Sequence, residues 1–176
     1  ILLPLIDALM EQAGLNPTDL GLVAVGQGPG AFTGIRLGCS VAQGIAMSLG
    51  LPMVTVNALL ATAMAFDTAT GITMVALDAR MDEVYFGVYA GAIELQTHVL
   101  LAAKDVQPFM QARLRFWQRA VGRSGPARLV GEGWQVVARC VGSGWVDEQT
   151  CALIDNQARP CAREIATVAL NRWHAG

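Results

Sequence analysis

The residues that could do chemistry are few in this sequence, and their spacing matches no familiar catalytic pattern. Neither of the two histidines, His98 and His174, lies four residues from another ligand type on a convincing helix, and no HExxH or HxxxH pattern is present, which argues against a zinc or iron hydrolase. Cys39 and Ser40 are potential nucleophiles, but each lacks an adjacent histidine that could act as a base. We therefore expect no metal site and no nucleophilic catalysis.

Three carboxylates surround one short polar segment between the β-rich runs 72–77 and 83–89. Asp78, Asp82 and Glu83 could supply a general base or a metal ligand, but Asp is also typical of tight turns, where it bonds the nearby backbone. We favour the turn, which predicts a hairpin connected by residues 78–82. Asp78 and Arg80 could in addition form a buried pair that fixes the hairpin.

A glycine-rich turn, GQGPG at 26–30, stands between a short apolar run and a long helical pattern. Gly28 and Gly30 allow a sharp reversal, and Thr33 is a better helix cap than Ala31 by chemistry. The free N–H groups at the start of that helix could bind an anion, with Gly28, Gly30 and Thr33 as the residues concerned. The glycines could equally serve only to close the turn, and the short motif by itself favours this second interpretation.

The helix after the turn is apolar nearly all round. Two rows recur every four residues: Gly34, Gly38, Ala42 and Ala46 form the small one, and Leu37, Val41, Ile45 and Leu49 form the bulky one. Such a helix is either buried in a core or covered by a partner, and the sequence leaves both open.

Arginines recur at four-residue spacing further along, at Arg115, Arg119 and Arg123, beside Phe116 and Trp117. Basic residues among aromatic ones can bind RNA, but such a row is more often the solvated face of a helix whose aromatic side chains point inward. We favour the solvated face and keep RNA contact as a possibility that needs a partner's help.

Composition excludes several classes. The net charge of −2 does not suit a protein that holds nucleic acid alone, and 53% hydrophobic residues can form a sizeable core. Four cysteines without metal-ligand spacing predict a reduced, cytoplasmic protein. The apolar stretch 45–66 is interrupted by glycine, proline and polar residues, which predicts a strand and a helix in place of a membrane span.

Alternating helical and strand patterns predict an α/β protein. We expect helices at 2–13, 33–49, 58–66, 106–121, 134–141 and 165–173, and strands at 20–26, 52–57, 72–77, 83–89 and 128–131, with an ambiguous strand near 98–100. Residues 1–70 and 71–176 form two expected α/β halves, and the final helix could pack back on the first. Because the sequence starts inside a helical pattern without Met, we expect that N-terminal residues are missing.

Three motifs, GQGPGAFTGIRLG, GLPMVTVNALLA and LDARMDEVYFGVY, resemble the bacterial TsaB (YeaZ) family. The resemblance covers most of the chain and implies the actin-like ATPase (ribonuclease H-like) fold of the sugar-kinase and Hsp70 superfamily, with two related halves and here without the N-terminal strands. It implies a non-catalytic subunit that is required for threonylcarbamoyladenosine modification of tRNA and that binds and stabilises the catalytic TsaD subunit.

The resemblance also implies site residues. The family's dimerising helices correspond to residues 2–13 and 33–49, which gives the partner interface Leu2, Leu5, Ile6, Leu9, Gly34, Leu37, Gly38, Val41, Ala42 and Ile45. Ala58 and Thr62 occupy the positions of two metal-binding histidines in the TsaD relative, so no metal site and no catalytic residue are expected. The superfamily's phosphate-contacting first-strand Asp is missing, and we expect no cofactor.

The implied partners are TsaD, the TsaE ATPase subunit, a second copy of the chain when it is alone, and tRNA only through the complex, with no membrane. The alternative is a small-molecule kinase or ATPase of the same superfamily that uses the glycine turn for phosphates. The absence of a well-placed base argues against that alternative.

Overall fold

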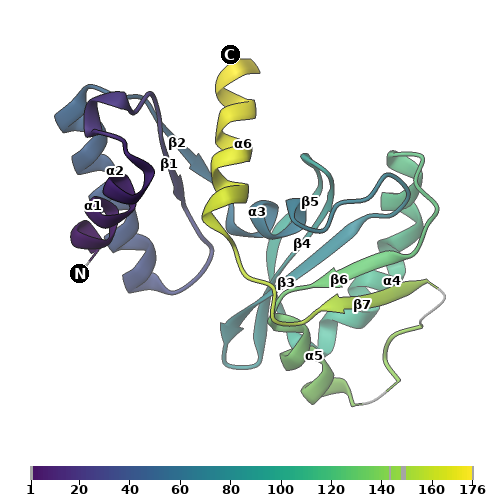
Figure 1. The fold of residues 1–176 in the computed structure, drawn as a ribbon. Coiled ribbons are helices and arrows are strands. Elements are labelled where there is room, and N and C mark those ends of the chain that lie inside the picture. Colours follow the sequence, from purple (N-terminus) through teal and green to yellow (C-terminus); the bar gives the residue numbers. More distant parts are fainter. Residues whose placement is uncertain (1, 143, 148–149, 176) are drawn as a thin grey trace.

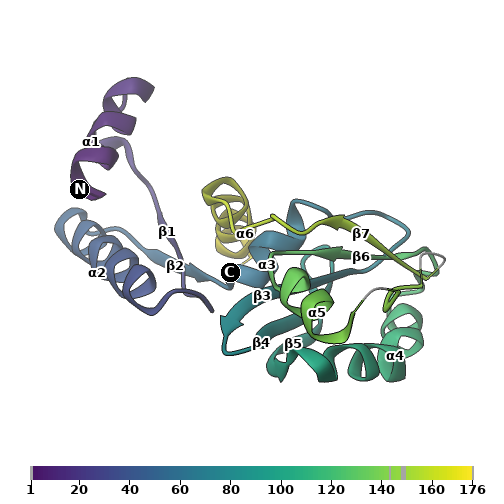
Figure 2. The ribbon, with the colours of Figure 1, turned by 90° about the horizontal axis from the view of Figure 1, so that it is seen from below.

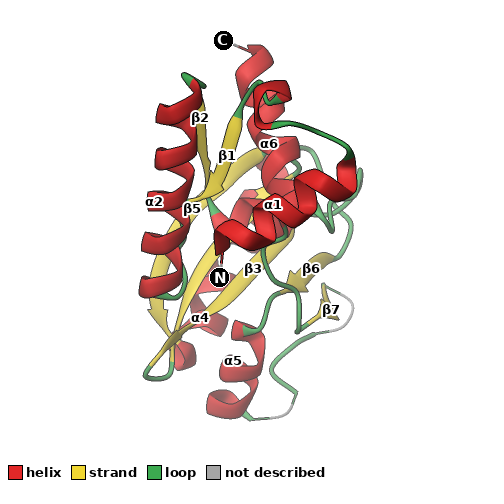
Figure 3. Ribbon diagram, turned by 60° about the vertical axis from the view of Figure 1, so that its left-hand side comes forward, coloured by secondary structure: helices red, strands yellow, loops and turns green. Residues whose placement is uncertain are grey.

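Two β-sheets organise the chain in the computed structural model, which describes residues 2–142, 144–147 and 150–175 (Figure 1). The smaller sheet pairs β1 (Val23–Gly26) with β2 (Met53–Val56) in parallel. Helix α2 (Phe32–Leu49) connects them across one face, and α6 (Ala162–Ala175) lies on the other face, as Figure 3 shows. Successive residues of a strand point to opposite faces. Accordingly, Val25 faces Gly38 of α2, and Gly26 faces Ile165 of α6.

The larger sheet has five strands in the order β5-β4-β3-β6-β7. Its antiparallel part consists of β3 (Thr73–Arg80), β4 (Glu83–Ala90) and β5 (Ile93–Ala102), and its parallel part adds β6 (Ala127–Val130) and β7 (Cys151–Asp155) to β3. Figure 2 shows α4 (Ala103–Ala120) and α5 (Gly133–Val141) on one side of this sheet, and α3 (Ala58–Met64) and α6 on the other. Helix α1 (Leu2–Ala13) and the short 3-10 helix at Pro17–Asp19 precede β1.

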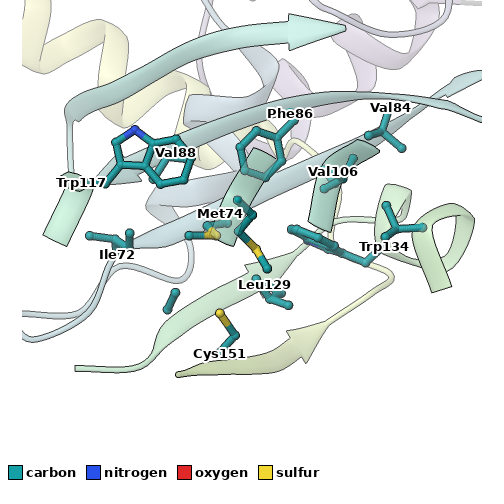
Figure 4. Close-up of a cluster of buried hydrophobic side chains, with 14 of the residues drawn as sticks. Ile72, Met74, Val84, Phe86, Val88, Val106, Trp117, Leu129, Trp134 and Cys151 are labelled. Carbon is teal, nitrogen blue, oxygen red and sulfur yellow. The ribbon is translucent and has the colours of Figure 1, made fainter. Parts of the chain in front are cut away.

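The face of the larger sheet under α4 and α5 carries an aromatic core (Figure 4). Met74 and Phe86 project from the sheet between Trp117 of α4 and Trp134 of α5, and all four side chains are buried. The Trp134 ring meets Phe86 edge-on with centroids 6.0 Å apart, and its Nε1 donates a hydrogen bond of 3.0 Å to the Val130 carbonyl. Trp134 is thus buried with its polar atom satisfied, as a core indole requires.

The opposite face of this sheet packs against α3 and α6 and connects the two sheets. Alternate residues of β3, Val75 and Leu77, contact the side chains of α3, while Val168 and Ala169 of α6 pack on the same cluster with Val56 of β2. Helix α6 therefore contacts β1 and β2 of the smaller sheet as well as α3. The division at residue 70 stays a prediction.

Most predicted elements are present, and three differ. The predicted connection 78–82 is largely strand, because the register pairs Arg80 with Glu83 and leaves only Met81 and Asp82 as a two-residue turn with positive φ. Strand β7 is absent from the prediction. Its five residues form an edge strand, which pairs only with β6. Residues 93–102, of which only a part near 98–100 is expected to be a strand, form all of β5.

The hydroxyl of Tyr89 is fully buried and has no hydrogen-bond partner among the described residues. Burial raises the pKa of the Tyr89 phenol above its usual range, and the Glu94 carboxylate raises it further. Ionisation of Tyr89 is therefore less favourable in the folded state than in the unfolded state. The neutral phenol costs the folded state no stability below the pKa of the unfolded chain, about 10, and the free energy of unfolding falls as the pH rises above that value.

We expect Tyr89→Phe to leave the free energy of unfolding at pH 7 unchanged or raised by up to about 1 kcal/mol, since an unsatisfied hydroxyl is removed. The variant should also lose less stability above about pH 10 than the parent does. Urea unfolding at neutral and alkaline pH measures both effects. A loss of several kcal/mol at pH 7 would instead show that the hydroxyl has a partner.

Among the described residues, no helix is both long enough and apolar enough to cross a membrane.

Candidate functional site

The glycine turn is held by backbone bonds and by close packing. Gly28 is buried with φ +87°, and an added Cβ would lie 2.6 Å from Ile35 Cδ1, so only glycine fits here. Its carbonyl accepts from the Ala58 amide at 2.8 Å, and the Gln27 amide donates to the Val56 carbonyl at 2.9 Å. These bonds attach the turn to the start of α3, next to the larger sheet.

Helix α2 begins one residue after Ala31, which has the extended backbone of an N-cap but no side-chain acceptor. The expected Thr33 cap is wrong, because the turn's extended backbone ends at Ala31 and Thr33 already lies in the first helical turn with its side chain exposed. The first N–H groups of α2 therefore have no side-chain partner among the described residues. That Gly28, Gly30 and Thr33 bind an anion stays a prediction.

The turn forms one wall of an open cleft of about 850 Å³. The other wall consists of side chains from the β3–β4 hairpin and from two loops, principally Leu77, Asp78, Arg80, Tyr85, Glu132 and Arg159. Charged groups in the cleft are paired with one another: Asp78 with Arg80 at 3.3 Å, and Glu132 with Arg159 at 2.7 Å. The Asp78 carboxylate also accepts the Arg80 backbone amide at 2.7 Å, which is the local turn role that the sequence predicts.

The sequence allowed a buried pair of Asp78 and Arg80. In the structure the two residues pair, but the pair is not buried, because the Arg80 side chain is 87% exposed at the end of the hairpin. Such an exposed pair adds little to stability. Within the described part of the chain no three His, Cys, Asp or Glu side chains could hold a metal ion together. Ala58 and Thr62 are buried on α3, where the Thr62 hydroxyl donates to the Ala58 carbonyl at 2.9 Å.

Sequence reasoning missed a contact between Asn57 and His98, which lie 41 residues apart. The Asn57 carbonyl oxygen caps α3 by accepting from the Leu59 and Leu60 amides at 2.7 and 3.4 Å. This cap orients the amide so that Nδ2 faces His98 Nδ1 at 2.9 Å, and His98 Nδ1 is then the acceptor. The only signal in the sequence was an Asn directly before a helix, which indicates the cap but not the histidine.

We expect Asn57→Ala to lower the free energy of unfolding by about 1–2 kcal/mol, because both the cap and the bond to His98 are lost. Asn57→Asp keeps the capping oxygen and should cost less at pH 7 than Asn57→Ala does. Thermal unfolding of the two variants side by side measures the difference. Equal losses would show that the cap contributes nothing.

Helices α1 and α2 both lie at the end of the molecule away from the larger sheet, and Figure 2 shows that they are separated from each other. No residue of α1 is buried, and Leu5 and Leu9 are 57% and 64% exposed. Helix α2 exposes Leu37 and Met47, and Arg36 stacks over the exposed Phe32 ring at 3.6 Å. Exposed apolar side chains on two helices at the same end of a molecule are typical of a protein interface.

The remaining interface residues from the sequence divide into two groups. The residues of the first group are accessible to a partner. The half-buried ones are Leu2, Ile6, Gly38, Val41 and Ile45, and the exposed one is Gly34. Ala42 is only 7% exposed because it packs, with Ala46, on the β1–β2 side of α2. The small-residue row therefore serves the chain's own sheet over its second half, and Ala42 has no surface to offer a partner.

The arginine row is also divided. Arg123 is a structural residue, since its guanidinium donates to Asp67 at 2.9 Å and to the Thr68 and Gly71 carbonyls at 2.7 and 2.8 Å. Trp117 points inward as expected, whereas Phe116 points outward and is 71% exposed. The expectation that both aromatic side chains face the core is wrong for Phe116, because only every third or fourth residue of a surface helix can face the sheet.

These elements define a mixed α/β protein with a cleft whose charges are paired and an apolar helical surface at one end. A family model described as "TsaD: tRNA N6-adenosine threonylcarbamoyltransferase" matches residues 1–116. The Escherichia coli tRNA threonylcarbamoyladenosine biosynthesis protein TsaB is 33% identical over 99% of this chain and 73% of its own length. The Haemophilus influenzae protein of that name is 42% identical over 48% of this chain and 37% of its own length.

Two solved Pseudomonas aeruginosa structures are similar. One is described as an uncharacterized protein with similarity to peptidase YEAZ (TM-score 0.78, 27% identity), and the other as YeaZ (TM-score 0.77, 28% identity). Each covers 99% of this chain, which spans 76% and 77% of theirs. The fold is the actin-like (ribonuclease H-like) α/β fold that the sequence predicts. The chain belongs to the TsaB (YeaZ) family.

Proposed function

We propose that this chain acts in threonylcarbamoyladenosine modification of tRNA as a non-catalytic subunit that binds and stabilises the TsaD subunit. Membership of the TsaB family supports the pathway. The observation that supports the binding role is the exposed apolar surface of α1 and α2, where Leu5, Leu9, Leu37 and Met47 are each more than half exposed. We infer that this surface is buried against TsaD in the assembly and against a second copy when TsaD is absent.

The cleft supports a role without chemistry. Its carboxylates, Asp78 and Glu132, are each paired with an arginine. Ala58 and Thr62 bring no ligand atom for a metal, since one has an apolar side chain and the other bonds its own helix. The kinase or ATPase alternative has only the uncapped N-terminus of α2 in its favour.

The same proposal includes TsaE as a further partner, tRNA bound through the complex, and a cytoplasmic location. The four cysteines support a reducing compartment, because Cys39, Cys140, Cys151 and Cys161 are all free thiols in the structure.

Reconstitution tests the proposal. The chain, TsaD and TsaE are combined with unmodified tRNA and the substrates of the reaction, and the modified nucleoside is quantified. We expect product only when this chain is present and no ATPase, kinase or peptidase turnover by the chain alone. Full product formation without the chain, or turnover by the chain that survives repurification, would refute the non-catalytic role.

A further inference from the structure

A strongly basic segment lies at the end of the molecule away from α1 and α2. Between residues 106 and 131 the sequence has five arginines and no Asp or Glu, although the whole chain has a net charge of −2. Helix α4 carries three of these arginines, and Figures 1 and 2 both place it across the larger sheet from the α1–α2 end. The net charge of the whole chain therefore does not reveal this local excess of positive charge.

Two of the arginines have no role in the fold. Arg115 and Arg119 are exposed, and neither side chain makes an ion pair or hydrogen bond with another described residue. By contrast, Arg113 lies over the Phe109 ring at 3.9 Å, Arg123 fastens the loop at 67–71, and Arg128 donates to the Phe66 carbonyl at 2.9 Å. Arg119 is favourable near the C-terminus of α4, but that explanation does not extend to Arg115, which is a full turn earlier.

The two free guanidiniums stand one helical turn apart, about 6 Å along the axis of α4. They line a shallow groove of about 410 Å³ whose other residues are Gln118, Gly122, Arg123 and Ser124. Phe116 is 71% exposed and precedes Arg119 by three residues, so these two side chains are neighbours on the surface of the helix. The surface thus combines free cationic donors with an exposed aromatic ring.

We propose that Arg115, Arg119 and Phe116 form an RNA-contacting surface that helps to bind the tRNA substrate; this rests on the proposed function. The guanidinium donors match phosphate oxygens, and the exposed ring can stack on an unpaired base. A membrane surface would need more apolar area than the single Phe116 supplies. Because α4 lies away from α1 and α2, tRNA can be held here while TsaD covers those helices.

The test is a tRNA-binding titration over a range of salt concentrations, with the full chain alone and in the reconstituted complex with TsaD and TsaE. Arg115→Gln/Arg119→Gln should weaken binding of unmodified tRNA about tenfold at moderate salt. It should also lower the slope of log affinity against log salt by about 1.4–1.8, the value for two lost phosphate contacts. Phe116→Ala should weaken binding with little change in that slope.

The control is Lys104→Gln/Arg139→Gln, which removes the same charge from exposed positions outside the groove and should leave the tRNA affinity unchanged. In the modification assay, the arginine variant should raise KM for tRNA and leave kcat unchanged. Wild-type affinity and salt slope in the arginine variant would overturn the RNA surface. Loss of binding to phosphatidylglycerol-containing vesicles, with tRNA binding unchanged, would overturn it too.

The outcomes separate this inference from the proposed function. If the wild-type complex modifies tRNA and the arginine variant matches it in KM and affinity, only the RNA surface is refuted. If the chain does not assemble with TsaD but binds tRNA through Arg115 and Arg119, the RNA surface is supported and the subunit role is refuted.

Discussion

Replacing Leu37 with Glu should weaken binding to TsaD by at least about a hundredfold, which corresponds to about 2.7 kcal/mol. Leu37 is 53% exposed on the outward side of α2, so the substitution places a carboxylate at the centre of the proposed interface. Docking would then bury a charge without a partner, and this cost adds to the lost apolar contact. We propose that the same apolar surface is buried against a second copy when TsaD is absent, so the variant should also be monomeric.

The fold itself should tolerate Leu37→Glu, because the side chain is half exposed and surface changes usually alter stability by less than about 0.5 kcal/mol. A calorimetric titration with TsaD measures the affinity, and circular dichroism melting measures the stability. Leu100→Glu is the matched control: Leu100 is 52% exposed but lies on β5 of the larger sheet. Undiminished binding by the Leu37 variant, or equal weakening by the Leu100 variant, would remove α2 from the interface.

Ala42→Glu, only five residues further along α2, should act in the opposite way and destabilise the chain by about 3 kcal/mol or more. Ala42 is 7% exposed and packs on the β1–β2 side of the helix. A longer charged side chain has neither the space nor a partner there, so α2 must shift away from the sheet. For a chain of this length, a loss of about 3 kcal/mol lowers Tm by about 6–12 °C.

Two further variants make this prediction specific. Gln43→Glu introduces the same carboxylate at the next, exposed position and should leave Tm within about 2 °C of the parent. Ala42→Gln has nearly the size of Glu without the charge, so the difference between the two Ala42 variants isolates the cost of burying a charge. A normal melt for Ala42→Glu would show that α2 does not pack on the smaller sheet through its small-residue row.

Leu37 and Ala42 were both expected in the partner interface, but the structure exposes Leu37 and buries Ala42. Gly38 and Ala42 belong to a row that could equally face a partner or the chain's own core. In the structure, a Cβ added to Gly38 would approach Val25 of β1 at 4.0 Å, and Ala42 is buried, so this row faces the smaller sheet. The bulkier Leu37, on another side of α2, is the better candidate for a partner contact.

Local features of this protein were set by the sequence, because they depend on residues that are neighbours in the chain. The reversal at Gly28 needs a glycine, the end of α2 uses the left-handed conformation of Gly50, and the cap of α3 uses the side-chain oxygen of Asn57. The lack of a histidine at positions 58 and 62 can likewise be read directly. The α/β class likewise follows from the amino-acid sequence alone, because helical and strand patterns alternate along the chain.

Only the tertiary structure decided which way the ambiguous side chains point. A helix that is apolar all round has no periodic signal for its buried face, so the placement of Ala42 inside and Leu37 outside depends on where the β1–β2 sheet lies. Phe116 and Trp117 are adjacent aromatic residues on α4, and the position of the larger sheet buries one and exposes the other. Asn57 and His98 are 41 residues apart in the sequence, so their contact depends on how the folded chain packs and not on local sequence.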